Sequence, residues 1–162
     1  MFWIRGRKTW SQYPDTTFEY ANWSTRPMRI HHTADSGPTN WSKASAKQER
    51  NYLRDVEYFH IKTRGYKAIA YSYIIMPSGR VYEGRGWQAK GAHTLGHNDD
   101  IGVCFAGNFT KQKPTWRSKI AYGLLKRRLR MRGARGSVKA YPHNSTFSTA
   151  CPGKYLEEML GL

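Results

Sequence analysis

The run Ile101-Gly-Val-Cys-Phe-Ala106 is nearly continuous in apolar side chains and has the length of a β-strand. A strand without polar alternation is typical of the middle of a sheet that is covered on both faces. Cys104, inside this run, is interpreted as a small buried hydrophobic residue. We therefore expect residues 101–106 to form a central strand.

Two further strand patterns precede this run. Residues 68–75 are rich in β-branched and aromatic side chains, and the turn Pro77-Ser-Gly79 leads into a return strand at residues 80–83, which together predict a hairpin. Residues 28–33 predict a short strand after Pro27, because proline is not tolerated inside a central strand.

Helical spacing appears between and after these strands. A helix is predicted to begin at Ser45, which can cap it, and a second helix is predicted from Pro114 to about Met131. In the second helix Trp116, Ile120 and Leu124 share one face. A short strand near Val138 and a last helix over residues 155–160 complete the pattern. The order predicts a single α/β domain in which helices flank a central mixed β-sheet.

Length and composition agree with one globular domain. The chain has 162 residues, of which 39% are hydrophobic, and it has no run of about 18 apolar residues that would span a membrane. We expect residues 1–26, which include Trp3, Trp10 and Trp23, to be an aromatic N-terminal extension packed on a domain formed by residues 27–162. The first residues lack an apolar run with a cleavage site, so we expect no signal peptide.

The charge of the chain is strongly basic and unevenly placed. The formal net charge is +16, and residues 101–156 contain twelve Lys and Arg but no acidic residue. Such a field favours a polyanionic partner, although a merely solvated basic face is the alternative. Because the sequence has no recognisable nucleic-acid motif, we expect no nucleic-acid partner. Anionic wall polymers and anionic lipid remain as expected partners of the basic segment 111–139, and charge alone does not choose between them.

Three separated features offer metal ligands: the pair His31-His32, then His143, and Cys151 eight residues later. A catalytic zinc site uses three imidazole, thiolate or carboxylate ligands and leaves one position open. Adjacent residues on a strand point to opposite faces, so one histidine of the pair can face such a site. The spacing alone leaves the metal open.

Several motifs, in order along the chain, are similar to those of the peptidoglycan recognition protein and type 2 N-acetylmuramoyl-L-alanine amidase family. The resemblance covers about residues 27 to 160. The motifs that carry it are Ile30-His-His-Thr-Ala34, Ala70-Tyr-Ser-Tyr-Ile-Ile75, Ser78-Gly-Arg-Val-Tyr-Glu-Gly-Arg85, Gly91-Ala-His-Thr-Leu-Gly-His-Asn98, Ile101-Gly-Val-Cys-Phe-Ala-Gly-Asn-Phe109, and His143 with Ala150-Cys-Pro-Gly153.

The resemblance implies a zinc-dependent amidase acting on peptidoglycan. It implies that Zn²⁺ is held by His31, His143 and Cys151, that His32 is a structural neighbour, and that Tyr71 is the active-site tyrosine. Thr149 stands where the similar phage lysozymes carry a lysine, while animal recognition proteins with amidase activity are similar to this chain here.

The remaining candidate residues are predicted to contact substrate: Thr33, Arg85, His93 and Asn98. For Arg85 the argument is that guanidinium binds carboxylates through two parallel hydrogen bonds. The alternative for Arg85 and Asn98 is that they are solvated loop residues, and the alternative for His93 is a structural or solvated role. Tyr71 has the alternative of a plain core aromatic.

Two functions follow as hypotheses. The first is an amidase that cleaves the bond between the muramic acid lactyl group and the stem peptide, as a monomeric phage endolysin held in the host cytoplasm before release. The alternative is a non-catalytic peptidoglycan-binding module on the same fold, which in this family is typically marked by loss of the cysteine ligand. Cys151 is present, which favours the enzyme.

Overall fold

A computed structural model describes residues 4–22 and 24–162, so Trp3 and Trp23 lie outside the described residues. Its centre is a six-stranded sheet in the order β1-β4-β3-β5-β2-β6. The strands are β1 (Ile4–Arg5), β2 (Met28–His32), β3 (Tyr73–Ile75), β4 (Val81–Glu83), β5 (Ile101–Phe105) and β6 (Ala140–Pro142). The β3–β4 hairpin is antiparallel and the other described pairs are parallel, so the sheet is mixed, as predicted.

The central position of β5 is confirmed. It lies between β3 and β2, and all five of its residues are buried. The apolar run therefore fills both faces of the sheet, with Val103 in one core and Cys104 on the opposite face of the strand.

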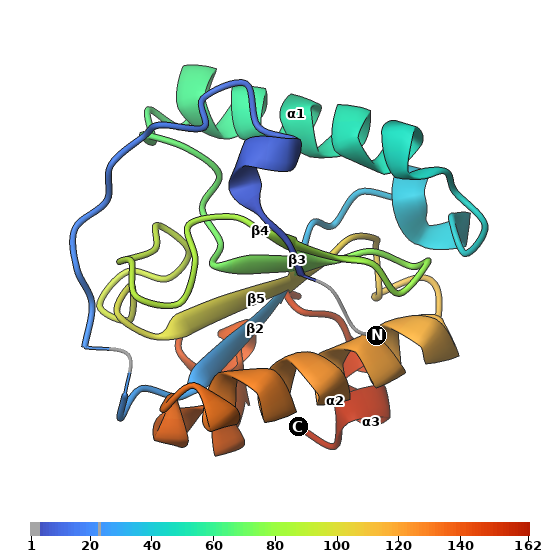
Figure 1. The fold of residues 1–162 in the computed structure, drawn as a ribbon. Coiled ribbons are helices and arrows are strands. Elements are labelled where there is room, and N and C mark those ends of the chain that lie inside the picture. Colours follow the sequence, from blue (N-terminus) through green and yellow to red (C-terminus); the bar gives the residue numbers. More distant parts are fainter. Residues whose placement is uncertain (1–3, 23) are drawn as a thin grey trace.

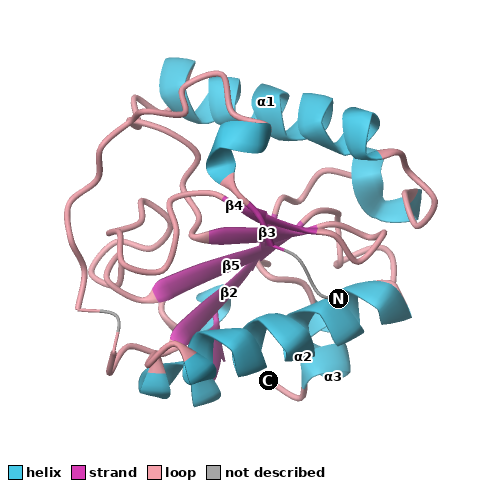
Figure 2. Ribbon diagram, viewed as in Figure 1, coloured by secondary structure: helices cyan, strands magenta, loops and turns pink. Residues whose placement is uncertain are grey.

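Helices cover the two faces of the sheet (Figures 1 and 2). Helix α1 (Ala46–Lys62) lies on one face, and α2 (Trp116–Met131) and α3 (Lys154–Leu160) lie on the other. This is the predicted single domain of a sheet flanked by helices. No helix in the described part of the chain is both long and apolar enough to cross a membrane.

Both long helices begin at a side-chain cap, of which Ser45 was predicted. The Ser45 hydroxyl accepts a hydrogen bond from the Gln48 amide, and the Thr115 hydroxyl accepts one from the Ser118 amide. The buried side of α2 is formed by five residues, Ser118, Ala121, Tyr122, Leu125 and Leu129. The face shared by Trp116, Ile120 and Leu124 is exposed instead.

The strand predicted at residues 68–75 is shorter than expected, since β3 begins at Tyr73. Before it, the chain follows an irregular path. The Ala70 amide donates to His60 Nδ1 on α1 and the Ser72 amide donates to the Gly102 carbonyl, while the Tyr71 and Ser72 carbonyls accept from the amides that follow β4. This irregular path brings Tyr71 close to α1.

The N-terminal segment contributes to the sheet and to the core. Strand β1 pairs with β4, and the Trp10 side chain is fully buried with its indole N–H donating to the Glu83 carbonyl at 2.8 Å. The Arg7 guanidinium donates to Glu57 of α1 at 2.6 Å, and both side chains are buried. These contacts fix the segment against α1 and β4.

Candidate metal centre

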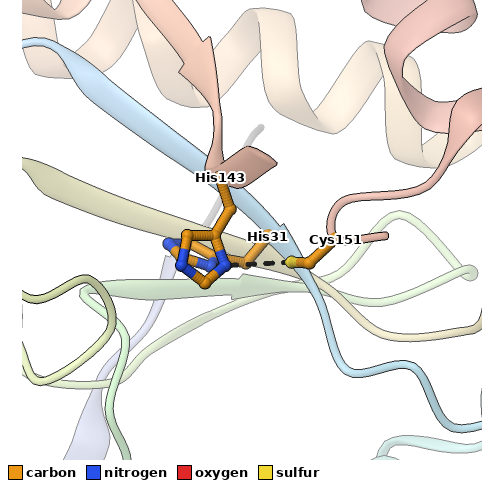
Figure 3. Close-up of side chains that lie close together, drawn as sticks. All are labelled: His31, His143 and Cys151. Carbon is orange, nitrogen blue, oxygen red and sulfur yellow. Dashed lines mark hydrogen bonds between the residues drawn. The ribbon is translucent and has the colours of Figure 1, made fainter. Parts of the chain in front are cut away.

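The parallel pairing of β2 with β6 brings the first two candidate ligands together. Ile30 is the register partner of Pro142, so the next residues along each chain, His31 and His143, come side by side at the ends of the strands. Their ring centroids are 4.5 Å apart. Figure 3 shows both rings and Cys151 pointing toward one another.

Cys151 reaches the same point from the loop after the short 3-10 turn His143–Ser145. The Asn144 amide donates to the Cys151 carbonyl at 3.0 Å, which closes this loop. The Cys151 Sγ atom accepts from the His32 amide at 3.4 Å and lies 3.7 Å from His31 Nδ1. The ligand atoms of His31, His143 and Cys151 all lie within 4.8 Å of one another. The structure thus brings the predicted ligand set together.

These three residues fit a zinc ion by their chemistry as well as by their positions. The His143 Nδ1 atom is buried and has no hydrogen-bond partner among the described residues. Burial lowers the pKa of His143, and it lowers that of His31 well below the usual range, with help from His93 and His143. Neutral imidazoles with free lone pairs are what zinc requires.

The third candidate ligand needs a cation to ionise. Burial raises the pKa of the Cys151 thiol to about 12, although the hydrogen bond from the His32 amide acts in the opposite direction. Without a nearby cation the thiol keeps its proton at neutral pH, and metal binding has to displace it.

His93 fixes which nitrogen of His31 faces the cluster. A backbone carbonyl can only accept, so His93 Nε2, 3.1 Å from the Asp100 carbonyl, carries a proton and donates it. His93 Nδ1 is then an acceptor, 3.1 Å from His31 Nε2. Thr94 Oγ1 shares this contact, 3.1 Å from His93 Nδ1 and 3.3 Å from His31 Nε2. A proton on His31 Nε2 supplies a donor for both of these acceptors and leaves Nδ1 free toward Cys151. This is the arrangement by which ligating histidines are commonly oriented.

The position of the His93 ring depends on two glycines. A Cβ at Gly91 would lie 2.3 Å from the His93 ring, and a Cβ at Gly102 would lie 2.4 Å from it. Burial lowers the pKa of His93 to about 3, so the ring stays neutral. The sequence analysis placed His93 at the substrate, but its ring is buried and bonded at both nitrogens, which gives it the structural role that was the alternative.

A buried ion pair that the sequence did not predict supports the positions of His93 and His143. Arg29 on β2 donates to the Asp100 carboxylate at 2.8 Å, with 5% and 2% of the two side chains exposed. Arg29 also donates to the Ser145 hydroxyl at 3.0 Å. The pair therefore joins β2 to the segment that orients His93 and to the turn that carries His143. A charged residue between Met28 and Ile30, two apolar residues of a predicted strand, was the signal in the sequence.

Tyr71 lies beside the cluster. Its ring centroid is 5.3 Å from that of His31 and 5.6 Å from that of His60. Burial and the neighbouring Cys104 thiol raise the pKa of Tyr71 well above its ordinary value, so the hydroxyl keeps its proton. The residue is positioned as a hydrogen-bond donor rather than as a base.

A groove of about 340 Å³ runs from Tyr71 along α1. Thr33 lines it, and the Thr33 hydroxyl is held by hydrogen bonds from the Tyr52 hydroxyl and the Gly107 amide, both at 2.9 Å. The remaining lining residues are Asp35, Tyr52, Asp55, Val56, Phe59 and His60. A substrate lying in this groove would contact Thr33 and Tyr71.

The other predicted site residues lie in different surroundings. Thr149 is exposed, and its hydroxyl accepts from the Cys151 amide at 3.2 Å. The Arg85 guanidinium donates to the carbonyls of Ile69 and Lys90 at 2.8 and 3.1 Å, and Asn98 accepts from the amides of His93 and Thr94. Main-chain contacts occupy both side chains, so their contact with substrate stays a prediction.

His32 points to the opposite side of β2 from His31. Its Nδ1 accepts from the Phe109 amide at 3.2 Å, and burial lowers its pKa to about 4. Its ring therefore lies outside the cluster, while its backbone amide contacts Cys151 Sγ, which agrees with the neighbour's role that the resemblance implied.

Solved structures show the class of fold. The structure of peptidoglycan recognition protein LE in complex with tracheal cytotoxin, a monomeric diaminopimelic acid-type peptidoglycan, superposes with a TM-score of 0.87 at 32% identity, over 97% of this chain and 91% of that one. The sheet and the helices of this chain thus have the architecture of a peptidoglycan recognition protein domain.

Sequence comparisons show the family. The family model described as N-acetylmuramoyl-L-alanine amidase matches residues 25–154, and the chain belongs to this family. A peptidoglycan recognition protein of Trichoplusia ni is 35% identical over 93% of the chain and 83% of its own length. The human N-acetylmuramoyl-L-alanine amidase is 34% identical over 82% of the chain. The chain spans 23% of that human protein and 31% of the Drosophila melanogaster peptidoglycan-recognition protein LE, which it also matches.

Proposed function

We propose that this chain is a zinc-dependent N-acetylmuramoyl-L-alanine amidase that hydrolyses the amide between the lactyl group of peptidoglycan and the first residue of the stem peptide. The observation that carries the proposal is the convergence of His31, His143 and Cys151, with ligand atoms within 4.8 Å, beside a groove that contains Tyr71. Membership of the amidase family supports the choice of reaction.

The residues divide the work as follows. His31 Nδ1, a His143 nitrogen and the Cys151 sulfur would hold Zn²⁺, which when bound supplies a Lewis acid for the scissile carbonyl and lowers the pKa of water. Tyr71 keeps its proton and donates it in a hydrogen bond to the oxygen on which negative charge develops. Thr149 can add a second hydroxyl at the exposed rim. Thr33 and the groove along α1 orient the stem peptide.

The decisive experiment combines metal analysis with turnover. Purified protein is expected to contain one zinc per chain and to release stem peptides from purified peptidoglycan, whereas Cys151→Ser loses both. Cys104→Ser is the matched control for zinc content, because the Cys104 thiol is buried in β5 outside the cluster, whereas any change in its turnover would reflect its contact with Tyr71. Full turnover by Cys151→Ser would refute the ligand set, and peptidoglycan binding without hydrolysis by the wild type would favour the non-catalytic module.

We also propose that the enzyme acts as an endolysin, made in the cytoplasm of a host bacterium and active on the wall after release. Both cysteines are free thiols, as a reducing compartment maintains them. Expression inside bacteria is expected to cause lysis only after the inner membrane is permeabilised. Lysis without permeabilisation, or intact walls after it, would contradict this role.

A further inference from the structure

The outer face of α2 exposes a row of large apolar side chains. Trp116, Ile120 and Leu124 follow one another at four-residue spacing, and Met131 continues the same side of the helix. Their exposed fractions are 67%, 52%, 38% and 78%. We call these four residues the α2 stripe. Arg127 interrupts the α2 stripe between Leu124 and Met131. Exposed apolar side chains gathered on one face of a helix usually mark contact with a partner.

Cations lie within and beside the α2 stripe. They are Arg127 within it and Arg117, Lys119, Lys126 and Arg130 beside it. Arg127, Arg130 and Arg135 also line a hollow together with Met131, at the C-terminal end of the helix. In the part of the chain that the structure describes, none of these cations forms an ion pair with a carboxylate. The surface thus offers apolar area and uncompensated positive charge in one place.

We propose that the outer face of α2 docks on the surface of an anionic lipid bilayer. A helix that presents an apolar row between basic flanks lies in the plane of the interface, with the apolar side chains among the acyl chains and the cations at the headgroup phosphates. Tryptophan favours this interfacial depth, which suits Trp116. A soluble polyanion would engage the cations and leave the apolar row in water, so the α2 stripe favours the bilayer.

The position of α2 leaves the metal centre accessible in the docked state. Leu125 on the inner side of the helix packs in the same core as Ile30 of β2, whereas the next residue, His31, points to the opposite face of the sheet. The groove beside Tyr71 runs along α1, on that opposite face (Figure 1). A bilayer on α2 therefore does not cover the groove.

The test is co-sedimentation of the full chain with vesicles of phosphatidylcholine alone or mixed with phosphatidylglycerol. Wild type is expected to bind the anionic vesicles and not the neutral ones. Trp116→Gln/Ile120→Gln/Leu124→Gln should weaken binding by at least about tenfold. Lys119→Gln/Arg127→Gln/Arg130→Gln should weaken it by roughly 100-fold at low salt.

Matched controls lie on or next to α1, which covers the opposite face of the sheet (Figure 1). Tyr58→Gln removes exposed aromatic area, and Lys47→Gln/Lys62→Gln/Arg64→Gln removes three exposed cations. Both controls should bind vesicles like wild type. Circular dichroism of each variant verifies the fold, and the assay needs neither zinc nor hydrolysis, so its result is independent of the proposed amidase activity.

The proposal is overturned if wild type does not bind anionic vesicles, or if the α1 controls lose binding as much as the α2 variants. Loss of binding only in the charge variant would indicate a surface for a soluble polyanion. Self-association of wild type without lipid, abolished in the apolar variant, would assign the α2 stripe to a second copy of the chain.

Discussion

The rings of His31 and His93 meet edge to face, with centroids 4.9 Å apart and His31 Nε2 3.1 Å from His93 Nδ1. The Asp100 carbonyl can only accept, so His93 carries its proton on Nε2 and donates it to Asp100. His93 Nδ1 is therefore an acceptor for the proton on His31 Nε2. A residue that touches no metal thereby decides which atom of His31 can bind one.

The first prediction concerns this positioning role. His93→Phe removes the acceptor for His31 Nε2–H, so zinc affinity should fall by about 10- to 100-fold. His93→Asn keeps an oxygen near the position of Nδ1 and should retain most of the affinity. Chelator competition with purified protein measures both constants. Equal affinity in wild type and His93→Phe would show that His31 needs no such partner.

A second prediction concerns the buried pair Arg29–Asp100. Asp100→Asn leaves the guanidinium without its counter-charge, which should lower the free energy of unfolding by about 3–5 kcal/mol. The neighbouring pair Arg26–Asp99 is a matched control, because it is 3.7 Å long and more than 40% exposed on each side, so Asp99→Asn should cost less than about 1 kcal/mol. Urea unfolding measures both. Equal losses of unfolding free energy in the two variants would mean that burial does not strengthen the Arg29–Asp100 pair.

Local patterns were sufficient for most of the fold. The apolar run of β5, the cap Ser45 and the start of the second long helix near Pro114 depend on residues close together in the sequence, and each was predicted. The ligand set was predicted through family motifs. What brings it together, the register of β2 with β6, depends on pairing between segments more than a hundred residues apart.

The parts that the sequence did not reveal depend on distant contacts. The tautomer of His31 depends on His93, 62 positions away, and the ring of His93 fits because Gly91 and Gly102 lack side chains. Similarly, β3 starts at Tyr73 and not at residue 68, and the Ala70 amide before it bonds to the His60 ring of α1. Propensity and periodicity contain no information about such pairs.

A third prediction is the dependence of stability on pH. Burial, assisted by Arg85 and Arg64, lowers the pKa of His60 to about 4 from 6.5. Between these values the unfolded chain binds the proton that the folded chain excludes, so stability falls as pH is lowered from 6.5 toward 4 and levels off below that window. One such histidine contributes a slope of about 1.4 kcal/mol per pH unit.

The variant His60→Asn tests this assignment. Its side-chain oxygen can still accept from the Ala70 amide, as His60 Nδ1 does, but it does not titrate. Urea unfolding across the window should show a slope lower than that of wild type by about 1.4 kcal/mol per pH unit, while buried His32 continues to contribute. An unchanged slope would show that His60 titrates normally in the folded protein.

The last prediction concerns the N-terminal segment, residues 1–26. Trp10 is fully buried in the core beside α1, and its indole N–H is bonded to the Glu83 carbonyl. Trp10→Ala should therefore lower the free energy of unfolding by about 3–5 kcal/mol. Tyr20→Ala in the same segment is the control, because 72% of that side chain is exposed, and it should change stability by less than about 0.5 kcal/mol.

If the segment only packed on a domain that is complete without it, Trp10→Ala would unfold the segment locally and leave the main unfolding transition in urea unchanged. We expect instead a single cooperative unfolding transition at a lower urea concentration, because β1 and Trp10 belong to the same sheet and core as the β3–β4 hairpin.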